Sequence, residues 1–204
     1  ATPSVNLHIV EDASEGTPTF AGATHFAVQA TASSSDNVNA SLISGSAGTS
    51  RIMFGDKDDE DIGKIEYNNS TNAMTITTNT ATAMTISSTG SITAGSIVLG
   101  NTDTDTSNTG NVTLDFSANQ NFVLTLTGNV TLVNPSTESV GQSGFIACIQ
   151  DGTGGRTLTL GTDYESAGGA GISLTSTAAA TDLVPYVVVA ANRILLGTPQ
   201  LAFS

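Results

Sequence analysis

The chain has 204 residues, of which 38% are hydrophobic, only 5% are aromatic and only 11% are charged. Its formal net charge of −13, from 18 acidic and 5 basic residues, disfavours the binding of nucleic acids and of anionic membrane surfaces, which require a basic surface. Disorder is also disfavoured, because β-branched residues are frequent and charges are few, and the composition favours strands joined by turns of Ser, Asn and Gly.

The chain has few large side chains from which to build a core. Buried apolar surface stabilises a fold by roughly 25 cal/mol per Å², and strands that carry Thr, Ala and Ser bury little of it. We therefore expect part of the stability to come from other copies of the chain, as in fibres and closed oligomers.

The N-terminal region, residues 1–50, is expected to form a β or attachment region. Its joints are rich in Gly, Ser and Pro, and the runs between them predict three short strands, at 5–10, 24–29 and 38–43. The start at Ala1 fits a processed product or a fragment of a longer protein.

Residues 51–108 have the pattern of short strands and turns that is typical of a β shaft. The segment Ala-Met-Thr-Ile occurs at 73–76 and again at 83–86. Further strands are predicted at 51–54, 62–67, 91–93 and 96–99. Repeats of this kind bury their faces against neighbouring strands or partner chains, so we expect a meander that needs such partners.

An acidic turn is the sharpest chemical feature of the shaft region. It contains Asp56, Asp58, Asp59, Glu60 and Asp61. Calcium takes about six to eight oxygen ligands, so the aspartates of this turn are a candidate structural calcium site, although the turn lacks the glycine and the distal glutamate of an EF-hand loop. The alternative is a solvated turn without a metal, in which case the protein needs no cofactor. The pair of acidic residues at 103 and 105 is a weaker candidate of the same kind.

Residues 109–204 are the most strand-dense part and are expected to form a β-sandwich or barrel-like domain. The hexapeptide Thr-Gly-Asn-Val-Thr-Leu occurs here at 109–114 and at 127–132. We expect Gly110 and Gly128 to turn the chain, which would separate strands at 111–116, 122–127 and 129–133. Further strands are predicted at 144–150, 156–160, 172–175, 183–190, 193–197 and 200–203.

Glycine and asparagine mark the turns of this C-terminal region. The glycine-rich segment 151–155 is expected to be a hairpin turn, and residues 191–192 a two-residue turn. A second glycine-rich stretch follows Tyr164, and we interpret Tyr164, Gly168 and Gly169 as a candidate receptor-facing loop. The alternative for all three residues is a structural role.

Catalysis is not indicated by any motif of the chain. A polysaccharide-cleaving site would require two carboxylates roughly 5 to 9 Å apart, and the sequence does not place any two of Asp151, Asp163, Glu165 and Asp182 together. Cys148, the only cysteine, falls in an apolar run and is expected to be a small buried hydrophobic residue.

Several segments resemble proteins of bacteriophage particles. The C-terminal domains of marine phage tail fibre proteins are similar to segments 121–132, 141–145, 150–158, 185–188 and 194–203. Segments 51–56 and 63–67, with the Met-Thr-Ile repeats, resemble phage fibre shaft modules. The resemblance implies a component of the virion surface that is usually a homotrimer, contacts other virion proteins and recognises a host surface glycan or protein. It supplies no receptor-binding residue.

The prediction is therefore an all-β, trimeric protein with an elongated shaft or meander and a C-terminal β domain. Its expected function is that of a tail fibre or fibre-like appendage that mediates adhesion without catalysis and without insertion into a membrane. Three alternatives stay open. They are a capsid decoration or cement protein, a polysaccharide-depolymerising tailspike, and a cellular surface adhesin or filament subunit.

Overall fold

The computed structural model describes residues 7–10, 26–29, 35 and 37–203, and the chain divides into two compact units between Ile97 and Val98. The described residues form strands, turns and one short 3-10 turn, so the predicted all-β class is confirmed. No helix in this part of the chain has the length and hydropathy needed to cross a membrane. The predicted division at residues 50 and 108 stays a prediction.

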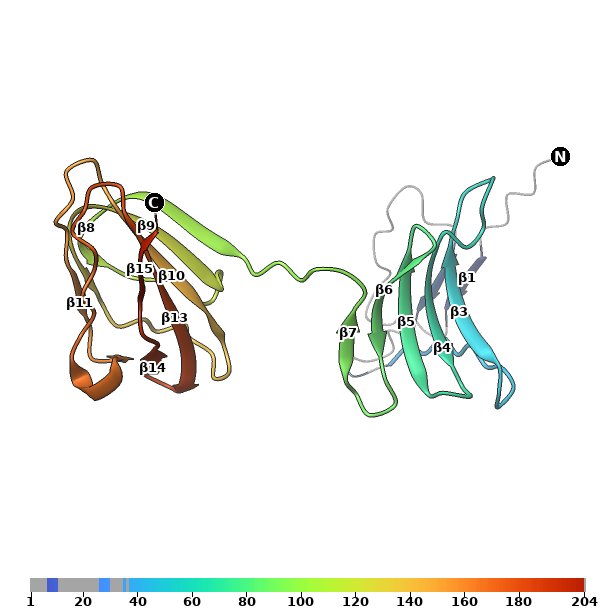
Figure 1. Ribbon diagram of the computed structural model, residues 1–204. Coiled ribbons are helices and arrows are strands. Elements are labelled where there is room, and N and C mark those ends of the chain that lie inside the picture. Colours follow the sequence, from blue (N-terminus) through green and yellow to red (C-terminus); the bar gives the residue numbers. More distant parts are fainter. Residues whose placement is uncertain (1–6, 11–25, 30–34, 36, 204) are drawn as a thin grey trace. The chain divides into compact units, whose positions relative to one another are not determined.

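The first unit contains a parallel strand pair and a five-stranded antiparallel meander (Figure 1). The parallel pair consists of β1 (Leu7–Val10) and β2 (Phe26–Gln29). The meander consists of β3 (Thr49–Phe54), β4 (Gly63–Asn68), β5 (Ala73–Thr78), β6 (Ala81–Ile86) and β7 (Ile92–Ala94), each paired with the next. The repeated Ala-Met-Thr-Ile segments are antiparallel neighbours, because Ile76 pairs with Met84 and Met74 with Ile86.

The strands predicted for this unit are confirmed in the meander, with two exceptions elsewhere. Residues 38–43 and 96–99 were expected to be strands and form none. All residues of both runs are exposed to solvent. Neither run lies beside a strand that could accept or donate its backbone hydrogen bonds. Of the predicted strands at 5–10 and 24–29, residues 7–10 and 26–29 are confirmed, and the others lie outside the described residues.

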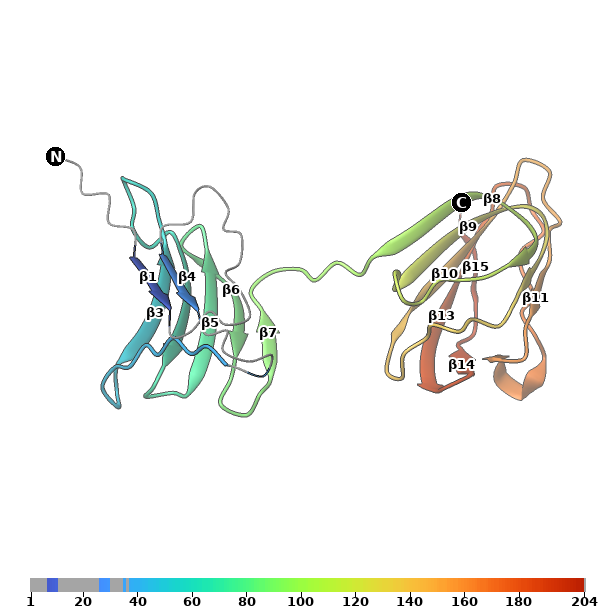
Figure 2. The ribbon, with the colours of Figure 1, turned by 180° about the vertical axis from the view of Figure 1, so that it is seen from behind.

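The second unit is an eight-stranded mixed sheet that curves into a half-barrel, shown from both sides in Figures 1 and 2. Its elements are β8 (Thr102–Val112), β9 (Asn121–Leu132), β10 (Ser143–Gln150), β11 (Leu158–Leu160), β12 (Tyr164–Glu165), the 3-10 turn η1 (Ala167–Gly169), β13 (Thr181–Ala190), β14 (Arg193–Leu196) and β15 (Gln200–Phe203). Strands β8, β10 and β11 are parallel to β9, whereas β13 is antiparallel to β10, β14 and β15.

Strict alternation builds the core of the half-barrel. In β9 the even-numbered residues Phe122, Leu124, Leu126, Val130 and Leu132 are all buried, while the odd-numbered residues are at least partly exposed. The same alternation in β13 and β14 adds further aliphatic and aromatic side chains to one cluster. Three buried aromatic rings of this cluster, those of Phe116, Phe122 and Tyr186, pack against one another.

The hexapeptide repeat does not mark turns, which corrects the sequence prediction. Gly110 lies inside β8 and Gly128 inside the single long strand β9. The two copies pair as parallel neighbours but out of register by two residues, since Gly110 is opposite Val130. A shift of two residues keeps each side chain on its face of the sheet, so both copies can follow the same alternation. The predicted strand at 111–116 ends at Val112, and Leu114 and Phe116 reach the core from a loop.

The loop after β10 is not a hairpin, which is a second correction. Strand β10 pairs with Phe122–Leu126 of β9, and β11 then pairs with Val130–Leu132 of the same strand. Because β8 takes the other edge of β9 along both stretches, β10 and β11 follow one another on a single edge. Residues 151–157 therefore form a loop that leaves this edge of β9 and returns to it. The side-chain amide of the buried Gln150 closes the loop, since its oxygen accepts a hydrogen bond from the N–H of Arg156 at 2.8 Å and its nitrogen donates one to the carbonyl of Arg156 at 2.9 Å.

Other predictions for this unit had mixed outcomes. The turn at 191–192 is confirmed, with Asn192 at a φ of 58° between β13 and β14. Cys148 is buried in the core cluster, as predicted, and burial raises the pKa of its thiol to about 12. Residues 172–175, predicted to be a strand, have no backbone ladder with a neighbour.

Candidate recognition site at the seam of the half-barrel

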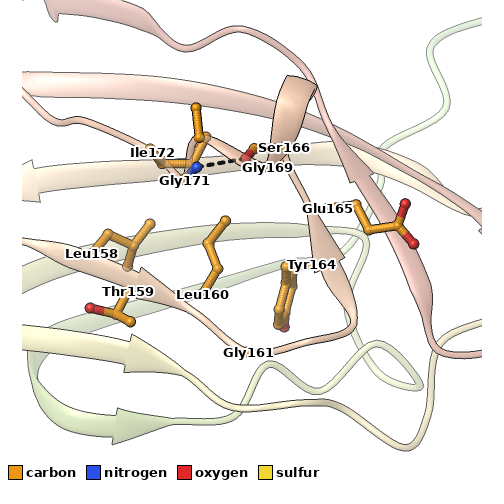
Figure 3. Close-up of a pocket in the computed structure, with 11 residues that line it drawn as sticks. Leu158, Thr159, Leu160, Gly161, Tyr164, Glu165, Ser166, Gly169, Gly171 and Ile172 are labelled. Atoms are coloured by element: carbon orange, nitrogen blue, oxygen red, sulfur yellow. Dashed lines mark hydrogen bonds between the residues drawn. The ribbon is translucent and has the colours of Figure 1, made fainter.

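A cleft of about 640 Å³ lies where the segment after β12 passes beside β11 (Figure 3). Leu158 and Leu160 of β11 form one side, and Ile172 lies on the other. The cleft falls within the range of about 300 to 1,000 Å³ that is usual for small-ligand sites. Its complete lining consists of Leu158, Thr159, Leu160, Gly161, Tyr164, Glu165, Ser166, Gly169, Ala170, Gly171 and Ile172.

The turn at residues 166–171, beside the cleft, is closed by its own short-range hydrogen bonds. The side-chain oxygen of Ser166 accepts a hydrogen bond from the N–H of Gly171 at 2.8 Å, and its carbonyl accepts one from Gly169 at 2.9 Å. Gly168 and Gly169 have φ values of 65° and 67°, which non-glycine residues adopt at a cost, and both are exposed. The backbone of this turn therefore favours glycine at both positions.

No backbone hydrogen bond of the described residues joins segment 170–174 to β11. Smaller hollows follow the same seam, one of about 240 Å³ farther along β11 and one of about 180 Å³ beside Leu196 of β14. Ile172 and Leu174 still pack against the core cluster. Side-chain packing thus holds the segment in place without a strand ladder, which leaves open space beside it.

Tyr164 was predicted to belong to the receptor-facing loop, but its side chain is only 4% exposed and belongs to the core. Its hydroxyl, like Oε2 of Glu138, is buried without a hydrogen-bond partner among the described residues. Burial raises the pKa of Tyr164 well above its usual range, and the charge of Glu138 adds to the effect. The exposed members of the predicted loop are therefore Gly168 and Gly169, whose contact with a receptor stays a prediction.

The carboxylates near the seam are engaged in structural contacts. Glu165 forms a two-bond ion pair with Arg193, at 2.7 and 2.9 Å, which lowers the pKa of the carboxyl group. In Figure 3 its side chain points away from Leu158 and Leu160. Asp151 binds Arg156 at 2.8 Å and also accepts two loop N–H groups, and these bonds lower its pKa to about 2. Asp182 is buried and accepts hydrogen bonds from Thr175 and Ala202.

The predicted calcium site lies in the other unit, between β3 and β4. Asp56 accepts hydrogen bonds from the N–H groups of Asp58 and Asp59, and Asp59 accepts one from Asp61. Lys64 binds the Asp61 carboxylate at 3.0 Å. In the part of the chain that the structure describes, no three His, Cys, Asp or Glu side chains are grouped so as to hold a metal ion. Calcium binding at this turn stays a prediction, which calorimetric titration with calcium tests.

Sequence patterns missed the residues that shape the seam. Leu158 and Leu160 were predicted only as strand residues, and Ile172 as part of a strand that does not form. The cleft arises because β11 and the segment after β12 are neighbours without being paired, and this depends on strand order. The Gly-rich stretch 167–171 was the one local signal for the site.

Residues 108–188 match a family model described as "Putative phage tail fibre C-terminal domain". No curated protein and no solved structure matched the chain. The matched region covers most of the half-barrel and includes β9, β10 and the cleft. The resemblance of the C-terminal region to a phage tail fibre is confirmed, and such a domain is part of a virion-associated component outside the cell.

Proposed function

We propose that the chain is a non-enzymatic tail fibre or fibre-like appendage that attaches the phage to its host, because residues 108–188 match the model of a putative phage tail fibre C-terminal domain. It works as a homotrimer. Residues 1–50 connect it to other virion proteins, residues 51–108 form the shaft, and residues 109–204 present the host-binding surface. The family match is the observation that carries this proposal.

The exposed turn beside the cleft supports the placement of host contact in the half-barrel. Gly168 and Gly169 are exposed, and the adjoining 640 Å³ cleft offers apolar walls from Leu158, Leu160 and Ile172. A surface glycan or an extended protein segment of the host could contact both. Loops placed on a rigid scaffold are frequent carriers of recognition, because they vary without disturbing the core.

The location of the protein on the particle tests the main proposal. Antibodies raised against the chain and labelled with gold should mark the tail in electron micrographs of the phage. Labelling of the head would favour a capsid decoration or cement protein instead. Labelling of uninfected cells would favour a cellular adhesin.

Catalysis is tested separately by incubating the purified chain with host polysaccharide and measuring new reducing ends. We expect none, because Asp151, Glu165 and Asp182 are each engaged with an arginine or with buried donors. Steady release of reducing ends would favour a depolymerising tailspike.

Host contact through the turn is tested with a surface substitution. Ala170 is exposed, has an ordinary φ of −77° and lines the cleft, so Ala170→Arg places a bulky charge there without straining the backbone. The labelled variant should bind host cells at least several-fold less than the parent chain. Ala118→Arg, in an exposed loop outside the cleft, is the control and should bind normally. Equal binding of both variants would place the receptor contact elsewhere.

A further inference from the structure

The meander of the first unit has one face that is almost wholly apolar. Strand register places its side chains in two rows across the sheet. The first row is Ile52, Ile65, Ile76, Met84 and Ala94, and the second is Ser50, Tyr67, Met74, Ile86 and Ile92. We call these ten residues the apolar face. It carries no charged side chain.

The opposite face of the same sheet is polar. One row across it runs from Arg51 through Glu66 to Thr75, Thr85 and Thr93. Arg51 and Glu66 form an ion pair at 2.9 Å. An antiparallel sheet with one polar and one apolar face normally has the apolar face covered.

Nothing in the described part of the first unit covers the apolar face fully. Among residues 37–97 the only buried residue is Thr77. Ile52 remains 50% exposed and Ile92 68% exposed, and Ile65, Tyr67 and Met74 are also exposed. A sheet that buries no hydrophobic side chain gains little from the hydrophobic effect, so its stability requires a cover.

We propose that the apolar face of the meander packs against the same face of other copies of this chain. This inference rests on the proposed homotrimer and names the surface that holds it together. The chain carries a net charge of −13, so copies repel one another in general. An uncharged face lets them touch without burying a carboxylate.

The size of the face favours three copies over two. Strands spaced about 4.8 Å apart, with residues about 3.4 Å apart, give a face of four six-residue strands and the three-residue β7 a footprint of roughly 440 Å². A dimer of two such faces would bury roughly 900 Å², below the range of about 1,200 to 2,000 Å² for a stable interface between two partners, whereas a trimer buries a third face in the same core. Three faces around one axis thus form a closed apolar core.

A hollow of about 440 Å³ at one end of the meander fits this arrangement. It lies between Phe54, Ile65 and Ile76, where Gly63 is opposite Phe54 and contributes no side chain. An apolar side chain from a neighbouring copy fills it, since close packing leaves few voids of that size inside an interface.

Neighbouring residues of β3 provide a matched test. Ile52 and Met53 are 50% and 45% exposed, but Ile52 lies on the apolar face and Met53 on the polar face. In light scattering of the full chain, Ile52→Lys should lower the mass from three chains to one chain of 20.5 kDa. Met53→Lys should keep the mass of the unmodified protein.

If Ile52→Lys does not fold, disulfide cross-linking tests whether the apolar face is the interface between copies. Met74 lies on the apolar face in the central strand β5, and its neighbour Thr75 lies on the polar face. On mild oxidation Met74→Cys should form disulfides between copies, and Thr75→Cys should not. The buried Cys148, whose pKa is raised to about 12, will not compete.

The outcomes separate this inference from the proposed trimer. A trimeric protein in which Ile52→Lys remains trimeric and Met74→Cys does not cross-link would overturn the interface and leave the trimer standing. A monomeric unmodified protein would overturn both. Loss of assembly in Ile52→Lys alone, or cross-linking of Met74→Cys alone, supports the interface.

Discussion

The carboxylate of Asp182 accepts a hydrogen bond from the backbone N–H of Ala202 at 2.8 Å, which fastens the last strand, β15, to β13. The same carboxylate accepts bonds from the N–H and the hydroxyl of Thr175. Asp182 is only 1% exposed. One buried side chain thus holds two segments that have little or no backbone ladder of their own.

Replacing this carboxylate should loosen both segments. We expect Asp182→Ala to lower the free energy of unfolding by about 2 to 4 kcal/mol, because the donors of Thr175 and Ala202 lose a charged acceptor inside the protein. Chemical denaturation measures the change. Asp103→Ala is the control, since the Asp103 carboxylate has no hydrogen bond to any residue that the structure describes, and it should cost less than about 0.5 kcal/mol. An Asp182→Ala variant as stable as this control would contradict the assignment.

The two buried tyrosines of the half-barrel should respond differently to loss of the hydroxyl. Tyr186 donates to the carbonyl of Gln120 at 2.6 Å, whereas the hydroxyl of Tyr164 has no partner among the described residues. Tyr186→Phe should therefore cost about 1 to 1.5 kcal/mol of unfolding free energy, and Tyr164→Phe should be neutral or slightly stabilising. Thermal melting of both variants compares them. An equal loss in Tyr164→Phe would mean that a bound water holds its hydroxyl.

Alternation made much of the meander and the core predictable from the sequence. The Ala-Met-Thr-Ile segments indicated β5 and β6 correctly, because each carries the period of two that places apolar side chains on one face of a sheet. The same reasoning failed at 38–43 and 172–175, which have strand-like composition but no paired neighbour. Pairing depends on residues far away in the chain, and local pattern does not report it.

The glycines of the hexapeptide show a second limit. Glycine in a run of Thr and Val was interpreted as a turn, but Gly128 lies in β9, where a Cβ would be 2.2 Å from Oγ1 of Thr109 in the next strand. Its role is close approach of two strands, which is a tertiary property. For the same reason the candidate site could be predicted only in part from the sequence. Glycine marked the turn at 168–169, but the cleft beside this turn arises from strand order.

Crowding at Gly128 leads to a test by double substitution. Gly128→Ala should cost about 1 to 3 kcal/mol of unfolding free energy, because the new methyl group meets Thr109. Thr109→Ala in the same chain removes the nearest atom, although the Cβ of residue 109 stays at 3.0 Å, and should recover part of the loss. Gly110→Asn is a useful comparison, because Gly110 has a φ of 68° and open space around it, which asparagine tolerates well. Strict additivity of the first two substitutions would contradict the contact.

The loop that replaces the expected hairpin should give the protein a defined sensitivity to acid. Arg156 and the loop N–H groups hold the pKa of Asp151 down at about 2, against an ordinary value of 3.8. Because the folded state favours the charged form, the stabilisation is complete above about pH 4 and is lost as the pH falls toward 2. Melting temperatures measured from pH 6 to pH 2 should therefore fall less steeply in Asp151→Asn than in the unmodified chain. The difference in melting temperature between the two proteins should be complete above about pH 4 and shrink as the pH falls toward 2. As a control, Asp103→Asn removes a carboxylate outside this loop, and its melting temperature should fall as steeply as that of the unmodified chain. An equally steep fall in Asp151→Asn would show that other carboxylates control the acid response.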